Sequence, residues 1–178
     1  GHPWVRGVFR RPHRPAPAPP PPQPHPSPPP PPIRRAQSNA VAGSFVPSVS
    51  VAFQTGNKAG NLIVVFVRMS TTTQTVQISD SAGNLYNRAV SQGQTEDGHQ
   101  THIFYAQNII GGANTVKAQF SSSNNHPWLA IYEYSGLSQT NPLDITASEQ
   151  GSSAVASAGP TGLTRAANEL VFIGAGFP

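Results

Sequence analysis

Leu62-Ile63-Val64-Val65-Phe66-Val67 is the stretch that decides the fold of this chain. The run is apolar throughout, is rich in β-branched residues and follows the turn-forming residue Gly60. A short apolar run of this composition behind a glycine favours a strand over a helix. Because no polar residue interrupts the run, we expect a strand buried in the middle of a sheet.

Half-buried strands are expected on both sides of this run. Val49, Val51 and Phe53 alternate with small or polar residues, which is the period of a strand with one buried face. A polar loop is expected over 91–100, and turn-forming residues recur about every 8–12 positions. Further strands are expected at 76–78, 86–90, 102–106, 116–120 and 128–134, with weaker candidates at 144–148, 154–158 and 169–173.

No window combines an apolar period of about 3.6 residues with helix caps, and the nearest candidate, Thr164 to Leu170, is too short to be stable alone. The chain is therefore predicted to be all-β, with roughly nine to eleven strands in an antiparallel β-sandwich of jelly-roll or Ig-like type.

The charge and the prolines of the 178 residues are concentrated at the N-terminus. Residues 1–35 carry six arginines and no acid, whereas residues 36–178 carry a net charge of −2, and 15 of the 20 prolines lie within residues 1–32. Proline fixes φ and lacks a backbone donor, so residues 1–32 are expected to form neither helix nor sheet. The predicted organisation is a disordered, basic polyproline linker over 1–35 and a β-sandwich domain over 36–178.

This linker is interpreted as a semi-rigid spacer. An alternative is that Arg14, Pro17 and Pro20, which have R-x-x-P-x-x-P spacing, bind a polyproline-recognising groove. The basic tail could contact phosphates non-specifically, but the slightly acidic body offers no basic face, so no specific nucleic-acid partner is expected.

Several classes of function are excluded by what the sequence lacks. Without cysteine there is no disulfide framework, no thiolate metal site and no Cys nucleophile. No apolar run approaches the ~18 residues of a membrane-spanning helix, so membrane insertion is not expected. The G-x-S-x-G and G-x-x-x-x-G-K motifs are also absent.

The apolar segment Leu170–Ile173 lies close to the C-terminal end of the sequence. A strand of this kind needs a pairing neighbour, because otherwise it leaves an exposed apolar edge. Either the sequence is a piece of a longer domain, or another chain completes the sheet.

A series of short segments, in order along the chain, resembles a poorly characterised β-sandwich domain of large bacterial secreted and cell-surface proteins. The segments are Ala59–Val64, Asp80–Tyr86, Ile103–Ile109, Gly111–Val116, Glu133–Gly136, Pro142–Asp144 and Ala167–Leu170. The resemblance covers residues 36–178 and implies an extracellular or cell-surface location with no established catalysis. That family's domain continues for further strands, so the resemblance also implies truncation at the C-terminal end.

Asp80 and Asn84 are the candidate metal ligands. They could offer oxygen atoms to calcium, which is the only cofactor that the sequence suggests. The favoured interpretation is a hairpin turn, with Asp80 bonded to nearby backbone and Gly83 at positive φ, because one carboxylate is too little charge for a strong calcium site. Asp97, His99 and His102 form a second cluster, which is interpreted as solvated loop residues.

Trp128, Tyr132 and Tyr134 are the candidate ligand-binding residues. Flat aromatic rings on a sheet face can stack on the apolar face of a sugar, and Trp128 follows a polar loop. The alternative is that these rings belong to the core, with Glu133 facing outward from the opposite side of the strand. As a glycosidase acid, Glu133 would need a second carboxylate, for which Asp144 and Glu149 are the downstream candidates.

The sequence favours a non-catalytic extracellular module for surface display, adhesion or spacing, with no catalytic residues. One alternative is a carbohydrate-binding module whose partner is a polysaccharide or a cell-surface glycan. Another is a subunit of a filament or surface layer that self-associates by strand pairing between chains.

Overall fold

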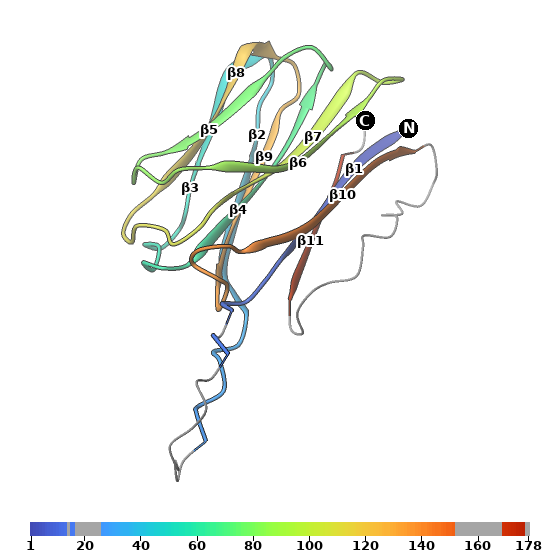
Figure 1. Ribbon diagram of the computed structural model, residues 1–178. Helices are drawn as coiled ribbons and strands as arrows, with labels where there is room; N and C mark the ends of the chain where they lie inside the picture. The colour runs from blue at the N-terminus through green and yellow to red at the C-terminus, as the bar shows by residue number, and fades with distance from the viewer. Residues whose placement is uncertain (14, 17–25, 152–168, 177–178) are drawn as a thin grey trace.

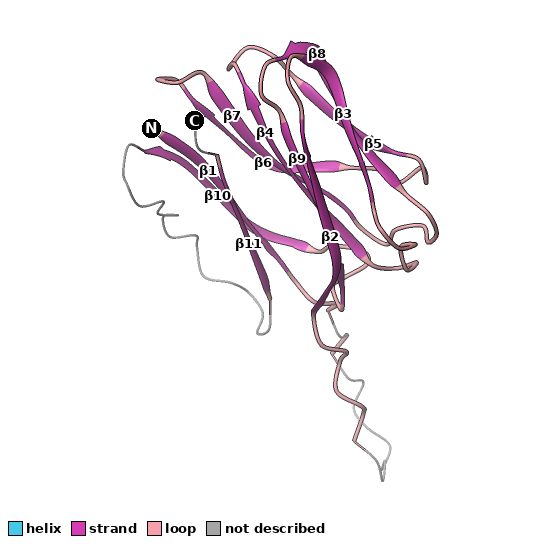
Figure 2. Cartoon of the chain, turned by 180° about the vertical axis from the view of Figure 1, so that it is seen from behind, coloured by secondary structure: helices cyan, strands magenta, loops and turns pink. Residues whose placement is uncertain are grey.

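The computed structural model describes residues 1–13, 15–16, 26–151 and 169–176, which contain eleven strands and no helix (Figures 1 and 2). None of them forms a helix able to span a membrane. The strands are β1 (His2–Phe9), β2 (Arg34–Ala42), β3 (Val46–Ala52), β4 (Leu62–Ser70), β5 (Val76–Asp80), β6 (Asn87–Gln94), β7 (His99–Ala106), β8 (Thr115–Asn124), β9 (Trp128–Ser135), β10 (Leu143–Gly151) and β11 (Leu170–Ala175).

The strands form three antiparallel sheets that lie as successive layers (Figure 1). The central sheet has the order β2-β9-β4-β7-β6. On one face it packs against the β8 sheet, of order β3-β8-β5, and on the other against the β1 sheet, of order β10-β1-β11. The prediction of an all-β, antiparallel sandwich-like chain is confirmed.

β4 shows why the central sheet contains the apolar run. Its odd-numbered residues, such as Ile63 and Val65, belong to the core shared with the β8 sheet. Its even-numbered residues, such as Val64 and Phe66, belong to the core shared with the β1 sheet. Since successive side chains point to opposite faces, a strand between two cores needs apolar residues at every position. The prediction of a buried central strand is confirmed.

The N-terminal strand β1 corrects an expectation. The prediction that residues 1–32 form neither helix nor sheet is wrong for His2–Phe9, which pair with β10 on one side and β11 on the other. Val5 and Phe9 lie in the core shared with the central sheet. The proline argument does not apply here, because Pro3 near the start of β1 is the only proline before Pro12.

The described parts of the proline-rich segment between β1 and β2 project from one end of the sandwich (Figures 1 and 2). Its described residues 12–13, 15–16 and 26–32 are all exposed. The polyproline-groove spacing of Arg14, Pro17 and Pro20 lies outside the described residues, and so do the strand expected at 154–158 and most of the helix candidate at 164–170.

Two other boundaries differ from the sequence prediction. β2, which begins at Arg34, was not predicted, because its residues are mostly exposed or half-buried and show no clear alternation. β6 and β7 extend into the segment expected to be a polar loop, where Gln94 and Gln100 are buried. Buried polar residues hide the strand period from a hydropathy pattern. Gln100, for example, is held inside by a hydrogen bond from its Nε2 to the Gln74 carbonyl oxygen at 2.7 Å.

Candidate functional site

Glu133 is a buried carboxylate at the end of β9. Its side chain is 1% exposed and lies on the face of the central sheet that carries Leu129 and Ile131, toward the β8 sheet. This corrects the interpretation of an outward-facing glutamate. Glu133 does lie on the opposite face of β9 from Tyr132 and Tyr134, as the alternation of side chains predicts, but both faces of this strand are covered by other sheets.

Four donors surround this carboxylate. Oε1 accepts hydrogen bonds from Gln37 Nε2 and Asn57 Nδ2, both at 2.8 Å. Oε2 accepts from the backbone N–H of Lys58 at 2.9 Å and from Asn61 Nδ2 at 2.7 Å. Burial alone would raise the pKa of Glu133, but these hydrogen bonds together hold its pKa below the ordinary value of 4.5. Glu133 is therefore an anion that anchors the loop between β3 and β4.

Asp80 performs a similar structural role at the end of β5. Oδ1 accepts from the backbone N–H groups of Gly83 at 2.8 Å and Asn84 at 2.9 Å. Oδ2 accepts from Asn84 Nδ2 at 2.8 Å, Tyr86 Oη at 2.7 Å and Asn114 Nδ2 at 3.0 Å. Burial raises the pKa of Asp80, yet the hydrogen bonds from Asn84, Tyr86 and Asn114 outweigh it and hold the pKa below 3.8.

The two candidate calcium ligands thus lie together but face internal donors. Gly83 has a φ of +87°, as the turn interpretation requires. The Oδ1 atom of Asn84 accepts the N–H of Ile110 at 2.8 Å. Within the described part of the chain, no group of three or more His, Asp and Glu side chains is arranged to hold a metal ion. The contacts of Asp80 and Asn84 favour the turn.

The three candidate aromatic residues lie in one row along β9 but in different environments. The Tyr132 and Tyr134 rings stack at 6.5 Å between centroids, and Tyr132 meets the edge of Phe172 from β11 at 4.9 Å. Tyr134 is buried, and Tyr132 is half-buried. Trp128 is 42% exposed, so it alone of the three presents a large part of its ring to solvent.

The histidines near this end of the sheet do not form a common site. Nε2 of His99 accepts a hydrogen bond from Arg68 at 2.8 Å, and burial followed by the charge of Arg68 lowers the pKa of His99. His102 is buried and bonded to Gln100 at 2.8 Å, so the interpretation of it as a solvated loop residue is wrong. Burial, and then the charge of Arg88, lower the pKa of His102 to about 4.

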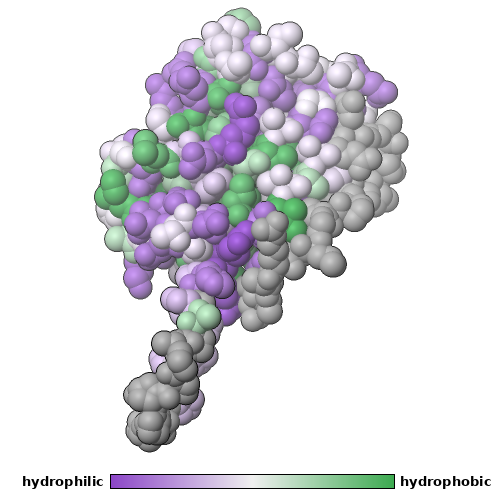
Figure 3. Space-filling model, viewed as in Figure 1, coloured by the Kyte–Doolittle hydropathy of each residue, from purple (hydrophilic) through white to green (hydrophobic). Residues whose placement is uncertain are grey.

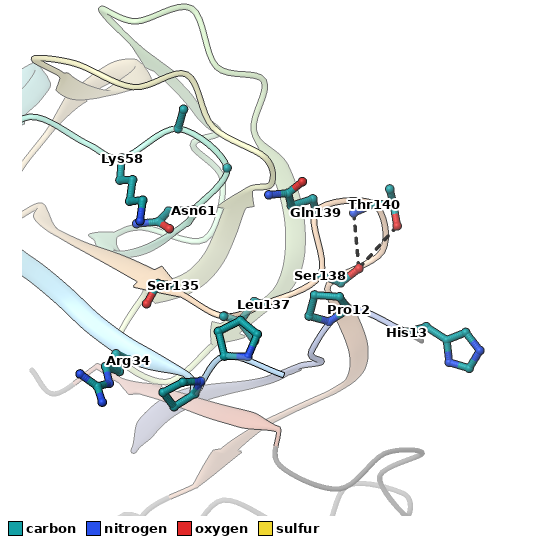
Figure 4. A pocket seen from close by; sticks show the side chains of 15 residues that line it. Pro12, His13, Arg34, Lys58, Asn61, Ser135, Leu137, Ser138, Gln139 and Thr140 are labelled. Carbon is teal, nitrogen blue, oxygen red and sulfur yellow. Dashed lines mark hydrogen bonds between the residues drawn. The ribbon is translucent and has the colours of Figure 1, made fainter. Parts of the chain in front are cut away.

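A cavity of about 700 Å³ opens where the base of the proline-rich segment meets two loops of the sandwich (Figure 4). Lys58–Asn61 line one wall and Ser135–Thr140 another. The base of the proline-rich segment contributes Pro12, His13, Pro31, Pro32 and Arg34. Gly136, with a φ of +83°, permits this contact, since a Cβ there would lie 2.4 Å from the Pro32 carbonyl oxygen.

The cavity has basic and amide groups but no carboxylate among its lining residues. Lys58 and Arg34 are exposed, and neither makes an ion pair with a described residue. Asp144, a proposed glycosidase partner of Glu133, is paired instead with Arg10. The described lining of the cavity therefore presents basic and amide groups, and the side chain of Glu149, the other candidate partner of Glu133, lies outside the described residues.

The sequence missed the Glu133 cluster because its members are scattered over β2, β9 and a loop. The sequence feature that could have indicated this cluster is a single glutamate in an apolar strand, together with the two asparagines, Asn57 and Asn61, that flank Lys58-Ala59-Gly60. When the chain is compared with known proteins, no protein-family model, no curated protein and no solved structure matches it.

Proposed function

We propose that this chain is a non-catalytic β-sandwich module of a bacterial secreted protein, used outside the cell for surface display, adhesion or spacing. The jelly-roll or Ig-like assignment belongs to the same proposal. The observation that supports it best is the state of the central acids. The carboxylate oxygens of Glu133 and Asp80 accept hydrogen bonds from donors within the chain, and Asp144 forms an ion pair with Arg10.

Hydrolysis of a glycosidic bond needs two carboxylates that flank a substrate and hold or release a proton near neutral pH. Glu133 is closed off from solvent, and its lowered pKa keeps it from acting as an acid at pH 7. The cavity beside it has no second acid among its lining residues. These features support a role in binding a partner or in spacing other domains.

The test is a screen of purified protein against a panel of polysaccharides and peptides, with products analysed by mass spectrometry. We expect no turnover. Turnover that disappears in Glu133→Gln while the fold is retained would overturn the non-catalytic assignment. Protease accessibility of the native protein on intact cells tests the location, since an extracellular module is digested without lysis.

Carbohydrate binding is a second candidate, favoured by the exposure of Trp128. An exposed indole on a sheet can stack on a sugar ring. Arg68, its cross-strand neighbour, is held in place by its hydrogen bonds to the His126 carbonyl oxygen and to His99. On a glycan array, Trp128→Ala should weaken binding about tenfold. Phe45→Ala, at another exposed aromatic, is the control and should leave binding unchanged. Equal loss in both variants would argue against a Trp128 site.

A further inference from the structure

β11 is an outermost strand with an unusual composition. It lies at one end of the order β10-β1-β11 and consists of Leu170-Val171-Phe172-Ile173-Gly174-Ala175. Phe172 and Gly174 point toward the central sheet, where a Cβ at Gly174 would lie 2.2 Å from the Phe66 ring. On the other face, Val171 and Ile173 are 44% and 54% exposed. The strand is thus fixed in place by its inner face and presents apolar side chains on its outer face.

Exposed strand edges attract other strands, and proteins protect them with charges, prolines, bulges or short length. Each of the other five outermost strands of the described sheets carries such protection. The protecting residues are Arg34 and Arg35 in β2, Pro47 in β3, Asp80 in the short β5, Arg88 in β6 and Asp144 in β10. β2, β3 and β6 also contain a bulge.

β11 is short, with 6 residues, but it has no charge, proline or bulge along its edge. It contains no charged residue and no proline, and its register with β1 is continuous from Trp4↔Ala175 to Phe9↔Leu170. Among the described residues no strand pairs with the outer edge of β11, and the other five outermost strands carry protection that this one lacks. The contrast indicates that this edge is adapted to pairing with a further strand.

We propose that β11 pairs with β11 of a second copy of this chain, antiparallel and around a two-fold axis, so that two β1 sheets form one continuous sheet. An uncharged strand is self-complementary, because antiparallel pairing opposes no like charges. The same pairing places Glu169 of each copy at opposite ends of the joint and, with the axis at Ile173, sets the two Ile173 side chains beside each other. A two-fold contact closes on itself and yields a dimer. The inference concerns an interface and does not depend on the proposed role in display.

The chain has no cysteine, so a single introduced thiol can report the contact. Under mild oxidation, Ile173→Cys should form disulfide-linked dimers, whereas Leu85→Cys, at a side chain that is 86% exposed in the β5–β6 turn, should remain monomeric on a non-reducing gel. Equal cross-linking of the two variants would overturn the proposal.

Sedimentation equilibrium of the full chain supplies an independent measurement. The unmodified protein should be dimeric, and Ile173→Lys should raise the dimer dissociation constant at least about tenfold, because a charge is placed beside its own copy. Leu85→Lys is the matched control and should dimerise as the unmodified chain does. A protein that stays monomeric at every concentration, or that forms larger polymers, would contradict the two-fold pairing.

Discussion

Two carboxylates, Glu133 and Asp80, organise the ends of the central and β8 sheets. Each lies where a strand meets a loop. Glu133 accepts from segments that are distant in sequence, whereas Asp80 accepts mostly from the turn that follows it and, at long range, from Asn114. A buried charge is tolerated only where hydrogen bonds replace its lost hydration. These residues therefore stabilise loops, and their substitution should be detected as a change in stability.

Replacing Glu133 with glutamine should lower the free energy of unfolding by about 2–3 kcal/mol, because an NH₂ group then faces two donors that lose their acceptor. Chemical denaturation at neutral pH measures the loss. Glu96→Gln removes a charge from an exposed side chain and should change the stability by less than about 0.5 kcal/mol. Similar values for the two variants would show that the Glu133 cluster is not stabilising.

His102 should make the fold sensitive to moderate acid. Burial lowers its pKa from 6.5 to about 4, so between these values the unfolded chain binds a proton that the folded chain does not. The stability therefore falls as the pH drops through this window, by up to about 3 kcal/mol. His102→Gln should remove most of this dependence, leaving a smaller contribution from His99, whose pKa is also lowered. An unchanged slope of unfolding free energy against pH would contradict the assignment.

At the level of elements, the sequence predicted strands wherever burial rests on apolar residues. β4 was located by its uninterrupted apolar run and β8 by strict alternation. β2 escaped prediction because none of its residues is buried and they show no clear alternation, whereas the extended ends of β6 and β7 escaped because their buried positions include polar residues, such as Gln94 and Thr101. The Glu133 cluster escaped for a related reason: its contacts depend on which strands become neighbours, and no local pattern encodes that.

Gly174 tests whether β11 belongs to this fold. Gly174→Ala should destabilise the chain by about 1–3 kcal/mol, because the added methyl group would meet the Phe66 ring and force β11 away from the central sheet. Gly93→Ala in β6 is the control, since its nearest neighbour lies 4.0 Å away and the change should be close to neutral. Thermal unfolding of the two variants compares their stabilities directly. If Gly174→Ala were as close to neutral as Gly93→Ala, β11 would not pack against Phe66 as described.

The whole molecule has three layers, and its surface mixes polar and apolar groups on the face seen in Figure 3. Its N-terminal segment is divided between two roles. Residues 2–9 supply the central strand of one sheet, and Arg10 pairs with Asp144, whereas the described residues 26–32, all proline except Ser27, are exposed. The prolines of the N-terminal region are thus concentrated in the segment between β1 and β2, and β1 itself contains only Pro3.

This division predicts the result of two deletions. Removing residues 2–9 takes away the only strand that pairs with β10 and β11 among the described residues, and it opens the core that contains Val5 and Phe9. Hydrogen exchange should then show β10 and β11 losing their protection. β3 and β8 should retain theirs, because they belong to the other core. Deleting residues 26–30 only shortens an exposed connection, which costs little free energy, so every strand should stay protected. If β11 kept its protection without β1, the two-core arrangement of the molecule would be wrong.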